Sequence, residues 1–183
     1  MRENTYAELM VHVPVCTHKE PKNVLIISDN ASAMMDEISK YNNIDATAIG
    51  TDVDALREID DKSFDVVVSE ADIDPVTTAH INRVLKEDGL ASFAPFDLEN
   101  VEQSTEKFKE LGKYFKIAMP YSLLATTVNT AVLASKEYHP TADINLQRAD
   151  LTDGFTVYNS DLHVGIFAMP TYIKKAYLGI IKN

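Results

Sequence analysis

The sequence has few of the residues that mark disulfide-linked, secreted or membrane-spanning proteins. Its single cysteine, Cys16, allows no disulfide framework within the 183-residue chain. No apolar run reaches the roughly 18 residues needed to span a bilayer. The first ten residues, MRENTYAELM, contain no apolar core of a signal peptide. These absences predict a cytoplasmic protein that does not associate with membranes.

Basic residues are also scarce. Seventeen Lys and Arg face 28 Asp and Glu, giving a formal net charge of −11. A nucleic-acid footprint requires clustered Lys and Arg, so nucleic acid is not an expected partner. A negative field raises the local concentration of cations and suits a cationic ligand such as an amine. On charge alone, an acidic surface that only keeps the protein soluble is the favoured interpretation.

Several short motifs of catalysis and metal binding are missing. The sequence has no P-loop, no G-x-S-x-G and no C-x-x-C. The spacing of His12, Cys16 and His18 matches no usual zinc pattern, so no metal site is expected. His163 has two interpretations, a catalytic histidine or a histidine satisfied by hydrogen bonds within a packed C-terminal segment.

Buried strands and helices alternate along most of the chain. Short apolar runs predict strands, and apolar residues at helical spacing predict the helices between them. Such alternation indicates βαβ units and a mostly parallel sheet. The predicted strands are residues 24–27, 46–50, 64–69 and 90–93, and the predicted helices are residues 32–41, 53–59, 77–85, 98–114 and 173–181.

The last two predicted strands, residues 115–120 and 130–135, differ from the rest. Only residues 121–129, a Ser/Thr-rich loop, separate them. This loop is too short for a crossover, so the two strands are expected to pair antiparallel. The pattern predicts an α/β chain with a Rossmann-like S-adenosylmethionine-dependent methyltransferase fold, forming a single domain over residues 1–183.

Polar side chains gather where the predicted strands end. In open α/β sheets, ligands bind beyond the carboxyl ends of the strands, which places residues 28–31, 51–52 and 69–75 on one rim. The segment SEADIDP after the strand 64–69 carries Glu70, Asp72 and Asp74. Carboxylates at this position can bind an ammonium group, orient it and accept its proton. The alternative is a solvated loop in which Asp74 caps the next helix.

Two segments resemble one family. TYAELMVHVPV near the N-terminus is similar to the Y-H/Q-E-M-L-x-H-x-P-L segment of the polyamine aminopropyltransferases, the spermidine synthases. YNSDLHVGIFAMP near the C-terminus is similar to their Y-Y-N-x-D-x-H-x-A-x-F-x-L-P. Both segments occur in the family's order with the expected fold between them.

The resemblance implies transfer of an aminopropyl group from decarboxylated S-adenosylmethionine to putrescine or a similar amine. It implies a co-substrate but no permanently bound cofactor. Tyr6 and Tyr158 match tyrosines of the amine site. The general base is expected among Asp72, Glu70 and Asp74, and the donor is expected at Ser28, Asp29, Asn30 and Asp52.

The sequence also departs from the family pattern. The glycine-rich donor turn becomes SDNASA, with Ala31 at the position of the family's donor-binding aspartate, and Ala7 replaces a His or Gln. Residues 44–59 best resemble the family's third strand, which implies that one βα unit is absent. The small N-terminal β-domain is also expected to be absent, with a homodimer formed through a different interface. The alternatives are a catalytically silent relative acting as a binding or interaction module, and another S-adenosylmethionine-dependent transferase.

Overall fold

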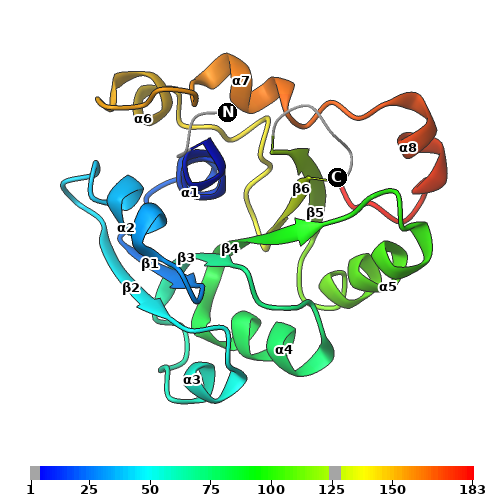
Figure 1. Cartoon of the computed structure of the whole chain (residues 1–183), viewed down its shortest axis with the longest axis horizontal. Helices are drawn as coiled ribbons and strands as arrows, with labels where there is room; N and C mark the ends of the chain where they lie inside the picture. Colours follow the sequence, from blue (N-terminus) through cyan, green and yellow to red (C-terminus); the bar gives the residue numbers. More distant parts are fainter. Residues whose placement is uncertain (1–4, 124–128) are drawn as a thin grey trace.

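The computed structural model describes residues 5–123 and 129–183, which form a six-stranded sheet with helices on both faces (Figure 1). The strand order is β2-β1-β3-β4-β6-β5. The first four strands of this order pair in parallel, and β6 runs antiparallel to both β4 and β5. The predicted mostly parallel sheet with an antiparallel C-terminal pair is therefore confirmed. The strands are β1 (Asn23–Ile27), β2 (Asp45–Ile49), β3 (Phe64–Ser69), β4 (Leu85–Phe96), β5 (Ile117–Ser122) and β6 (Thr130–Ser135).

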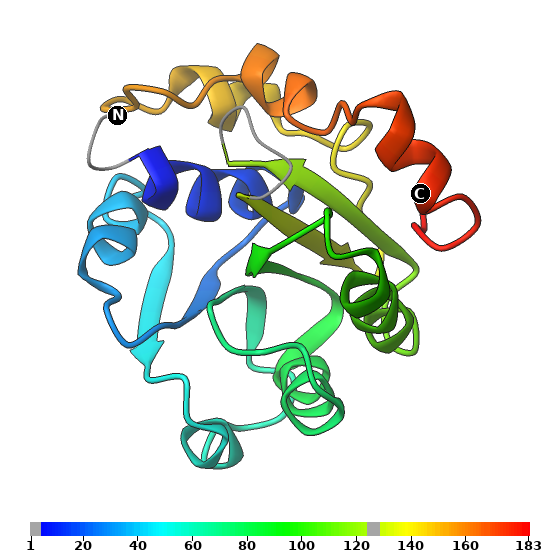
Figure 2. The same cartoon turned by 45° about the vertical axis from the view of Figure 1, so that its right-hand side comes forward.

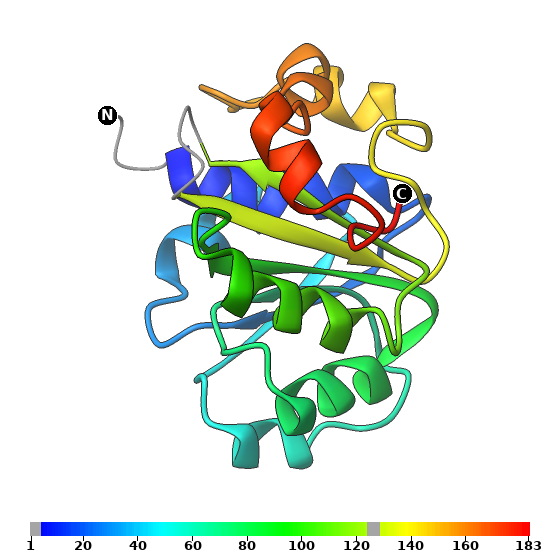
Figure 3. The ribbon, with the colours of Figure 1, turned by 90° about the vertical axis from the view of Figure 1, so that its right-hand side faces the viewer.

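Helices cover both faces of this sheet (Figure 2). One face carries α1 and α2, and the other carries α4 and α5 (Figure 1). The helices α6 and α7 lie outside α1, so that α1 is enclosed between the sheet and the C-terminal part of the chain (Figure 3). The helices are α1 (Thr5–Thr17), α2 (Ser32–Ile38), α3 (Val53–Arg57), α4 (Pro75–Val84), α5 (Val101–Leu111), α6 (Leu146–Leu151), α7 (Ser160–Gly165) and α8 (Thr171–Ala176).

The central strands send alternate side chains into two hydrophobic cores. In β1, Val24 and Ile26 join the core beneath α1, while Leu25 and Ile27 join the core on the α4 and α5 face. Successive side chains of a strand point to opposite faces of a sheet. Because helices cover both faces of the sheet, the central residues of β1 and β3 are continuous apolar runs in the sequence, residues 24–27 and 66–68.

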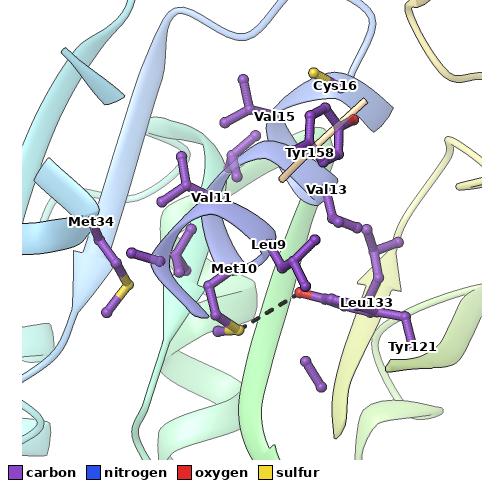
Figure 4. Packing of buried hydrophobic residues seen from close by; sticks show 14 of the residues in the cluster. Leu9, Met10, Val11, Val13, Val15, Cys16, Met34, Tyr121, Leu133 and Tyr158 are labelled. Atoms are coloured by element: carbon purple, nitrogen blue, oxygen red, sulfur yellow. Dashed lines mark hydrogen bonds between the residues drawn. The ribbon is translucent and has the colours of Figure 1, made fainter. Parts of the chain in front are cut away.

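The helix α1 has no counterpart among the predicted elements. Of its 13 residues only Tyr6 is not buried, so its apolar residues occur at nearly every position instead of at helical spacing. Figure 4 shows its side chains packing in several directions, with Met10 facing Tyr121 and Cys16 close to Tyr158. Among the described residues, no helix combines the length and the apolar composition that crossing a bilayer requires.

The strand β2 lies at one edge of the sheet and pairs with β1 along its whole length, from Asn23 opposite Asp45 to Ile27 opposite Ile49. The segment predicted to resemble the family's third strand therefore lies directly beside β1. Only a short turn separates α2 from β2, which accounts for the compact middle of the chain.

The ends of the predicted elements shift at the C-terminal part of the chain. The helix predicted over residues 173–181 ends at Ala176. Gly179 then adopts a φ of 77°, a left-handed conformation that glycine tolerates and other residues rarely adopt. This turn returns the chain to the sheet, where Lys182 pairs with Ala118 at the edge of β5. The predicted loop between β5 and β6 includes residues 124–128, which lie outside the described residues.

Candidate functional site

The carboxyl ends of β1 and β3 lie side by side in the middle of the sheet. Ile27 is opposite Ser69 in the register of the two strands. The backbone N–H of Glu70 donates to the carbonyl oxygen of Ile27 at 2.8 Å. Ser28 and Glu70 therefore leave neighbouring strands at the same level, at the edge where open α/β sheets bind their ligands.

Glu70 lies at the centre of a hydrogen-bonded group at this edge. The Tyr6 hydroxyl donates to Glu70 Oε1 at 2.7 Å, and the Ser28 hydroxyl donates to Glu70 Oε2. We call these three residues the Glu70 cluster. An ionised carboxylate can accept about four hydrogen bonds, so Glu70 keeps the capacity to accept from an incoming N–H group. Among the three predicted carboxylates, Glu70 is the one joined to other predicted site residues.

The helix α1 brings Tyr6 to this position. Tyr6 lies in its first turn, and the side chain remains 37% exposed while the rest of the helix is buried. Burial of the hydroxyl end, followed by the hydrogen bond to Glu70 and its charge, raises the pKa of the Tyr6 phenol well above its ordinary value. The phenol is therefore protonated at neutral pH and acts as the donor to Glu70.

Ser28 begins the glycine-free turn between β1 and α2. Its backbone N–H donates to the carbonyl oxygen of Ile49 at 2.9 Å, and its hydroxyl accepts from the backbone N–H of Asn30 at 3.0 Å. The side chain is only 4% exposed. The turn is thus held by backbone bonds to β2 and by the serine hydroxyl, and that hydroxyl faces Glu70 instead of the solvent.

The three other residues predicted to bind the donor, Asp29, Asn30 and Asp52, lie on the rim beyond β1 and β2. The carboxylate of Asp29 accepts from the backbone N–H and the hydroxyl of Thr51, both at 2.9 Å, and these bonds lower its pKa. Gly50 leaves room for this contact, because an added Cβ would lie 3.3 Å from Asp29 Oδ1. Asp52 caps α3 by accepting from the backbone N–H of Asp54. Asp29, Asn30 and Asp52 are all exposed.

Asp72 and Asp74 follow Glu70 but take different positions. Asp74 caps α4: its Oδ1 accepts from the backbone N–H groups of Val76 and Thr77, and its Oδ2 accepts from the Thr77 hydroxyl. The capping alternative for Asp74 is therefore the one that the contacts support. Asp72 lies exposed on the loop and has no place in the Glu70 cluster.

Tyr158 does not join the Glu70 cluster. Its side chain is 3% exposed, and its hydroxyl lies 2.6 Å from His163 Nδ1. His163 Nε2 donates to the carbonyl oxygen of Pro140, so Nδ1 accepts from Tyr158. Burial lowers the pKa of His163 to about 4. The structure therefore supports the interpretation of His163 as a buried, hydrogen-bonded residue and gives Tyr158 a structural part beside it.

Glu8 explains why the two family-like segments occur together, and it was not among the predicted site residues. Its buried carboxylate accepts from the backbone N–H groups of Thr156, Val157 and Tyr158 and from the Thr156 hydroxyl. These hydrogen bonds hold the pKa of Glu8 below its ordinary value, although burial alone would raise it. Its place within the N-terminal family-like segment was the available signal. The contacts tie α1 to the C-terminal segment and so fix the helix that carries Tyr6.

The residues considered for metal binding are separated in the structure. His12 contacts the Tyr41 hydroxyl and Glu37 Oε2, both at 2.8 Å, within a buried network beneath α2. Cys16 Sγ lies 3.6 Å from the same Tyr41 hydroxyl. His18 lies beyond the end of α1, so the three residues do not converge on one ion.

His18 instead approaches Asp65 and Asp88, with potential ligand atoms all within 4.8 Å of one another. Lys86 already pairs with Asp65 at 2.8 Å. The backbone N–H of Glu20 donates to His18 Nδ1, which leaves the proton of the neutral ring on Nε2. A metal-bound histidine normally donates from its other ring nitrogen, and Nδ1 cannot do so here. This arrangement fits a neutral histidine beside the Lys86–Asp65 ion pair better than it fits a metal site.

Comparison with known proteins indicates the same family that the two terminal segments resemble. A family model described as the spermine/spermidine synthase domain matches residues 3–66. A polyamine aminopropyltransferase of Helicobacter pylori (strain G27) is 26% identical over 204 aligned positions, which cover 97% of this chain and 78% of the relative. The enzyme of that name from Clostridium beijerinckii is also 26% identical, covering 97% of this chain and 79% of the relative. The 204 aligned positions exceed the 183 residues of this chain, so the alignment contains gaps.

Solved structures support the fold. A spermidine synthase in complex with the transition state analogue AdoDATO has a TM-score of 0.83 at 22% identity, covering 98% of this chain and 76% of that chain. Spermidine synthase from Thermotoga maritima gives a TM-score of 0.82 at 22% identity, covering 98% and 75%. The family model and the curated relatives extend the similarity beyond the fold: residues 3–66 match the spermine/spermidine synthase domain, and nearly the whole chain is similar in sequence to polyamine aminopropyltransferases.

Proposed function

We propose that this chain transfers an aminopropyl group from decarboxylated S-adenosylmethionine to putrescine or a similar amine. The observation that carries the proposal is the Glu70 cluster, in which Tyr6 and Ser28 hold a carboxylate at the carboxyl ends of β1 and β3. The resemblance and the curated relatives supply the reaction class, and this carboxylate supplies a general base where that reaction requires one.

The reaction is a displacement at carbon. The amine nitrogen forms a bond to the aminopropyl carbon attached to the sulfonium, while the carbon–sulfur bond breaks and its electron pair stays on sulfur. Methylthioadenosine leaves as the neutral thioether. The attacking nitrogen must lose a proton, and Glu70 is the residue that we assign to accept it. Holding the two reactants in line supplies much of the rate enhancement in such a reaction.

Tyr6 has two parts in this proposal. Its hydroxyl donates to Glu70 Oε1 and fixes one carboxylate oxygen. Its partly exposed ring offers an aromatic face to a bound ammonium, an attraction of about 0.5–2 kcal/mol. The acidic balance of the chain, with a net charge of −11, raises the local concentration of both cationic substrates.

The donor is assigned to the rim formed by Asp29, Asn30 and Asp52. These side chains are exposed beyond the ends of β1 and β2. Asp29 is held by Thr51 and keeps lone pairs that can accept from a ribose hydroxyl or an ammonium group. Ala31 cannot supply a carboxylate at this rim, so Asp29 and Asp52 are the acidic residues that remain for the donor.

Isothermal titration with methylthioadenosine and with decarboxylated S-adenosylmethionine tests this assignment. We expect saturable binding of both compounds, weakened at least about tenfold by Asp52→Asn. Glu102→Gln, an exposed acidic residue on α5, is the matched control and should leave both affinities unchanged. Absence of binding at millimolar ligand would contradict the enzyme assignment and favour the catalytically silent relative.

We keep a homodimer as part of the proposal. Several large apolar side chains of the C-terminal part are exposed, among them Leu178 at 84% and Leu151 at 71%. Exposed apolar patches of this kind mark association surfaces when they are contiguous. Light scattering at micromolar protein concentration should give twice the monomer mass of 20.4 kDa. A mass that stays at 20.4 kDa would remove the dimer from the proposal.

A further inference from the structure

Ser28 is placed to act on Glu70 and not on a ligand. A serine hydroxyl carries one proton, and here that proton is donated to Glu70 Oε2. The oxygen of the Ser28 hydroxyl accepts in turn from the backbone N–H of Asn30 at 3.0 Å. With the side chain 4% exposed, the hydroxyl has its donor and its acceptor bonds within the protein.

The backbone around Ser28 is also fixed from two directions. Its own N–H donates to the carbonyl oxygen of Ile49 in β2. Glu70, its partner, is anchored through its own N–H to Ile27 in β1. The backbone of both residues is therefore held by the sheet. This fixes the direction of the hydrogen bond between their side chains.

We infer that Ser28 is a positioning residue for the general base: its hydroxyl and that of Tyr6 hold the two oxygens of Glu70 and so fix the plane of the carboxylate. This inference rests on the proposed function. A glutamate side chain has several freely rotating bonds, so an unheld carboxylate samples many orientations. With only the hydrogen bond from Tyr6, the Glu70 carboxylate could still rotate about that contact. Hydrogen bonds to both of its oxygens, from Tyr6 and Ser28, prevent this rotation.

This role gives a physical reason for the absence of glycine at position 28. Glycine would leave Glu70 Oε2 without its serine partner and would leave the N–H of Asn30 without its acceptor. The Ser28 side chain occupies space in the turn after β1, and its hydroxyl orients the carboxylate of Glu70. Ser28 thereby moves from the predicted donor-binding residues to the support of the base.

Steady-state kinetics with decarboxylated S-adenosylmethionine and putrescine tests the inference. Ser28→Ala should lower kcat about tenfold or more, as expected for loss of a hydrogen bond to a charged group, with little change in the KM for the donor. Ser28→Thr keeps the hydroxyl and should recover most of kcat. Ser104→Ala is the matched control. Ser104 is a buried serine on α5, outside the assigned site, and its hydroxyl donates to the carbonyl oxygen of Asp97. This variant should leave kcat unchanged.

A double variant separates orientation of the base from contact with the donor. If Ser28 acts through Glu70, adding Ser28→Ala to Glu70→Gln should lower kcat no further. A full additional tenfold loss in the double variant, or a rise in the KM for the donor with an unchanged kcat, would overturn the inference. An active wild type with an unaffected Ser28→Ala variant would overturn the positioning role alone. A wild type without activity would overturn the proposed function itself.

Discussion

The Tyr6 hydroxyl donates to Glu70 Oε1 at 2.7 Å across 64 positions of sequence. This bond joins the first turn of α1 to the loop that follows β3. It depends on α1 being held in place, and Glu8 does this by binding three backbone N–H groups of the C-terminal segment. The candidate site is therefore assembled from both ends of the chain around the central strands.

Removing the Tyr6 hydroxyl should reduce activity without unfolding the protein. Tyr6→Phe keeps the ring but leaves Glu70 Oε1 without its donor. We expect kcat/KM for putrescine to fall about tenfold, measured with decarboxylated S-adenosylmethionine at saturation. Tyr172→Phe serves as the control, because it removes the hydroxyl of another exposed tyrosine, on α8, that donates to Glu99 and not to Glu70. Unchanged kinetics of Tyr6→Phe would exclude the bond from the mechanism.

Replacing Glu8 should reduce stability more than most substitutions. Glu8→Ala leaves the N–H groups of residues 156–158 without their buried acceptor. We expect a loss of about 3 kcal/mol or more in the free energy of unfolding, because each buried N–H group left without an acceptor costs about 1–3 kcal/mol. Urea unfolding followed by circular dichroism measures it. Glu102→Ala on the exposed face of α5 should stay within about 0.5 kcal/mol of wild type, and a similarly small effect at Glu8 would contradict the buried contact.

The depressed pKa of Glu8 also predicts a dependence of stability on pH. The unfolded state protonates this carboxyl near its ordinary value of 4.5, while the folded state keeps it ionised to lower pH. Its contribution is therefore complete above pH 4.5 and is lost as the pH falls from there through the folded-state pKa. Unfolding free energies of wild type and Glu8→Gln measured between pH 6 and 3 should converge toward the acidic end. A constant difference over that range would show that the pKa of Glu8 is not lowered in the folded protein.

Buried His163 predicts a separate loss of stability in mild acid. Its folded-state pKa is about 4, below the ordinary 6.5, so the unfolded state takes up its proton first as the pH falls. Its stabilising contribution is complete above pH 6.5 and is lost on going down to pH 4, amounting to about 3 kcal/mol. His163→Gln should be less dependent on pH over this window in thermal or urea unfolding. An identical slope in wild type and variant would mean that His163 is not held neutral.

Much of the fold could be predicted from the sequence because the buried strands carry local signals. The FDVVVS run matches β3 residue for residue, and the short loop before residue 130 correctly indicated antiparallel pairing. The helix α1 could not be predicted in this way. It is enclosed on all sides by the sheet and the C-terminal segment, so its sequence carries no amphipathic period.

The site was predictable as a region but not as a set of contacts. The sequence shows acidic and hydroxyl side chains at the ends of β1 and β3. It gave Glu70 as one of three candidates for the general base. The contacts of the three carboxylates differ: Asp74 caps α4, Asp72 is exposed, and Glu70 accepts from Tyr6 and Ser28. For Tyr158 the family-like segment gave the residue but not its burial against His163. These outcomes depend on long-range packing, which local patterns do not carry.

The most direct test of Glu70 as the general base compares wild type with Glu70→Gln. Each protein is given decarboxylated S-adenosylmethionine and putrescine, and mass spectrometry measures the aminopropylated amine and the methylthioadenosine that form. We predict product and methylthioadenosine in equal amounts from wild type, and a rate at least about a hundredfold lower from Glu70→Gln, as expected for loss of a general base. Asp72→Asn, measured in parallel, should keep most of the wild-type rate. Equal rates from wild type and Glu70→Gln would contradict the assignment of Glu70 as the general base.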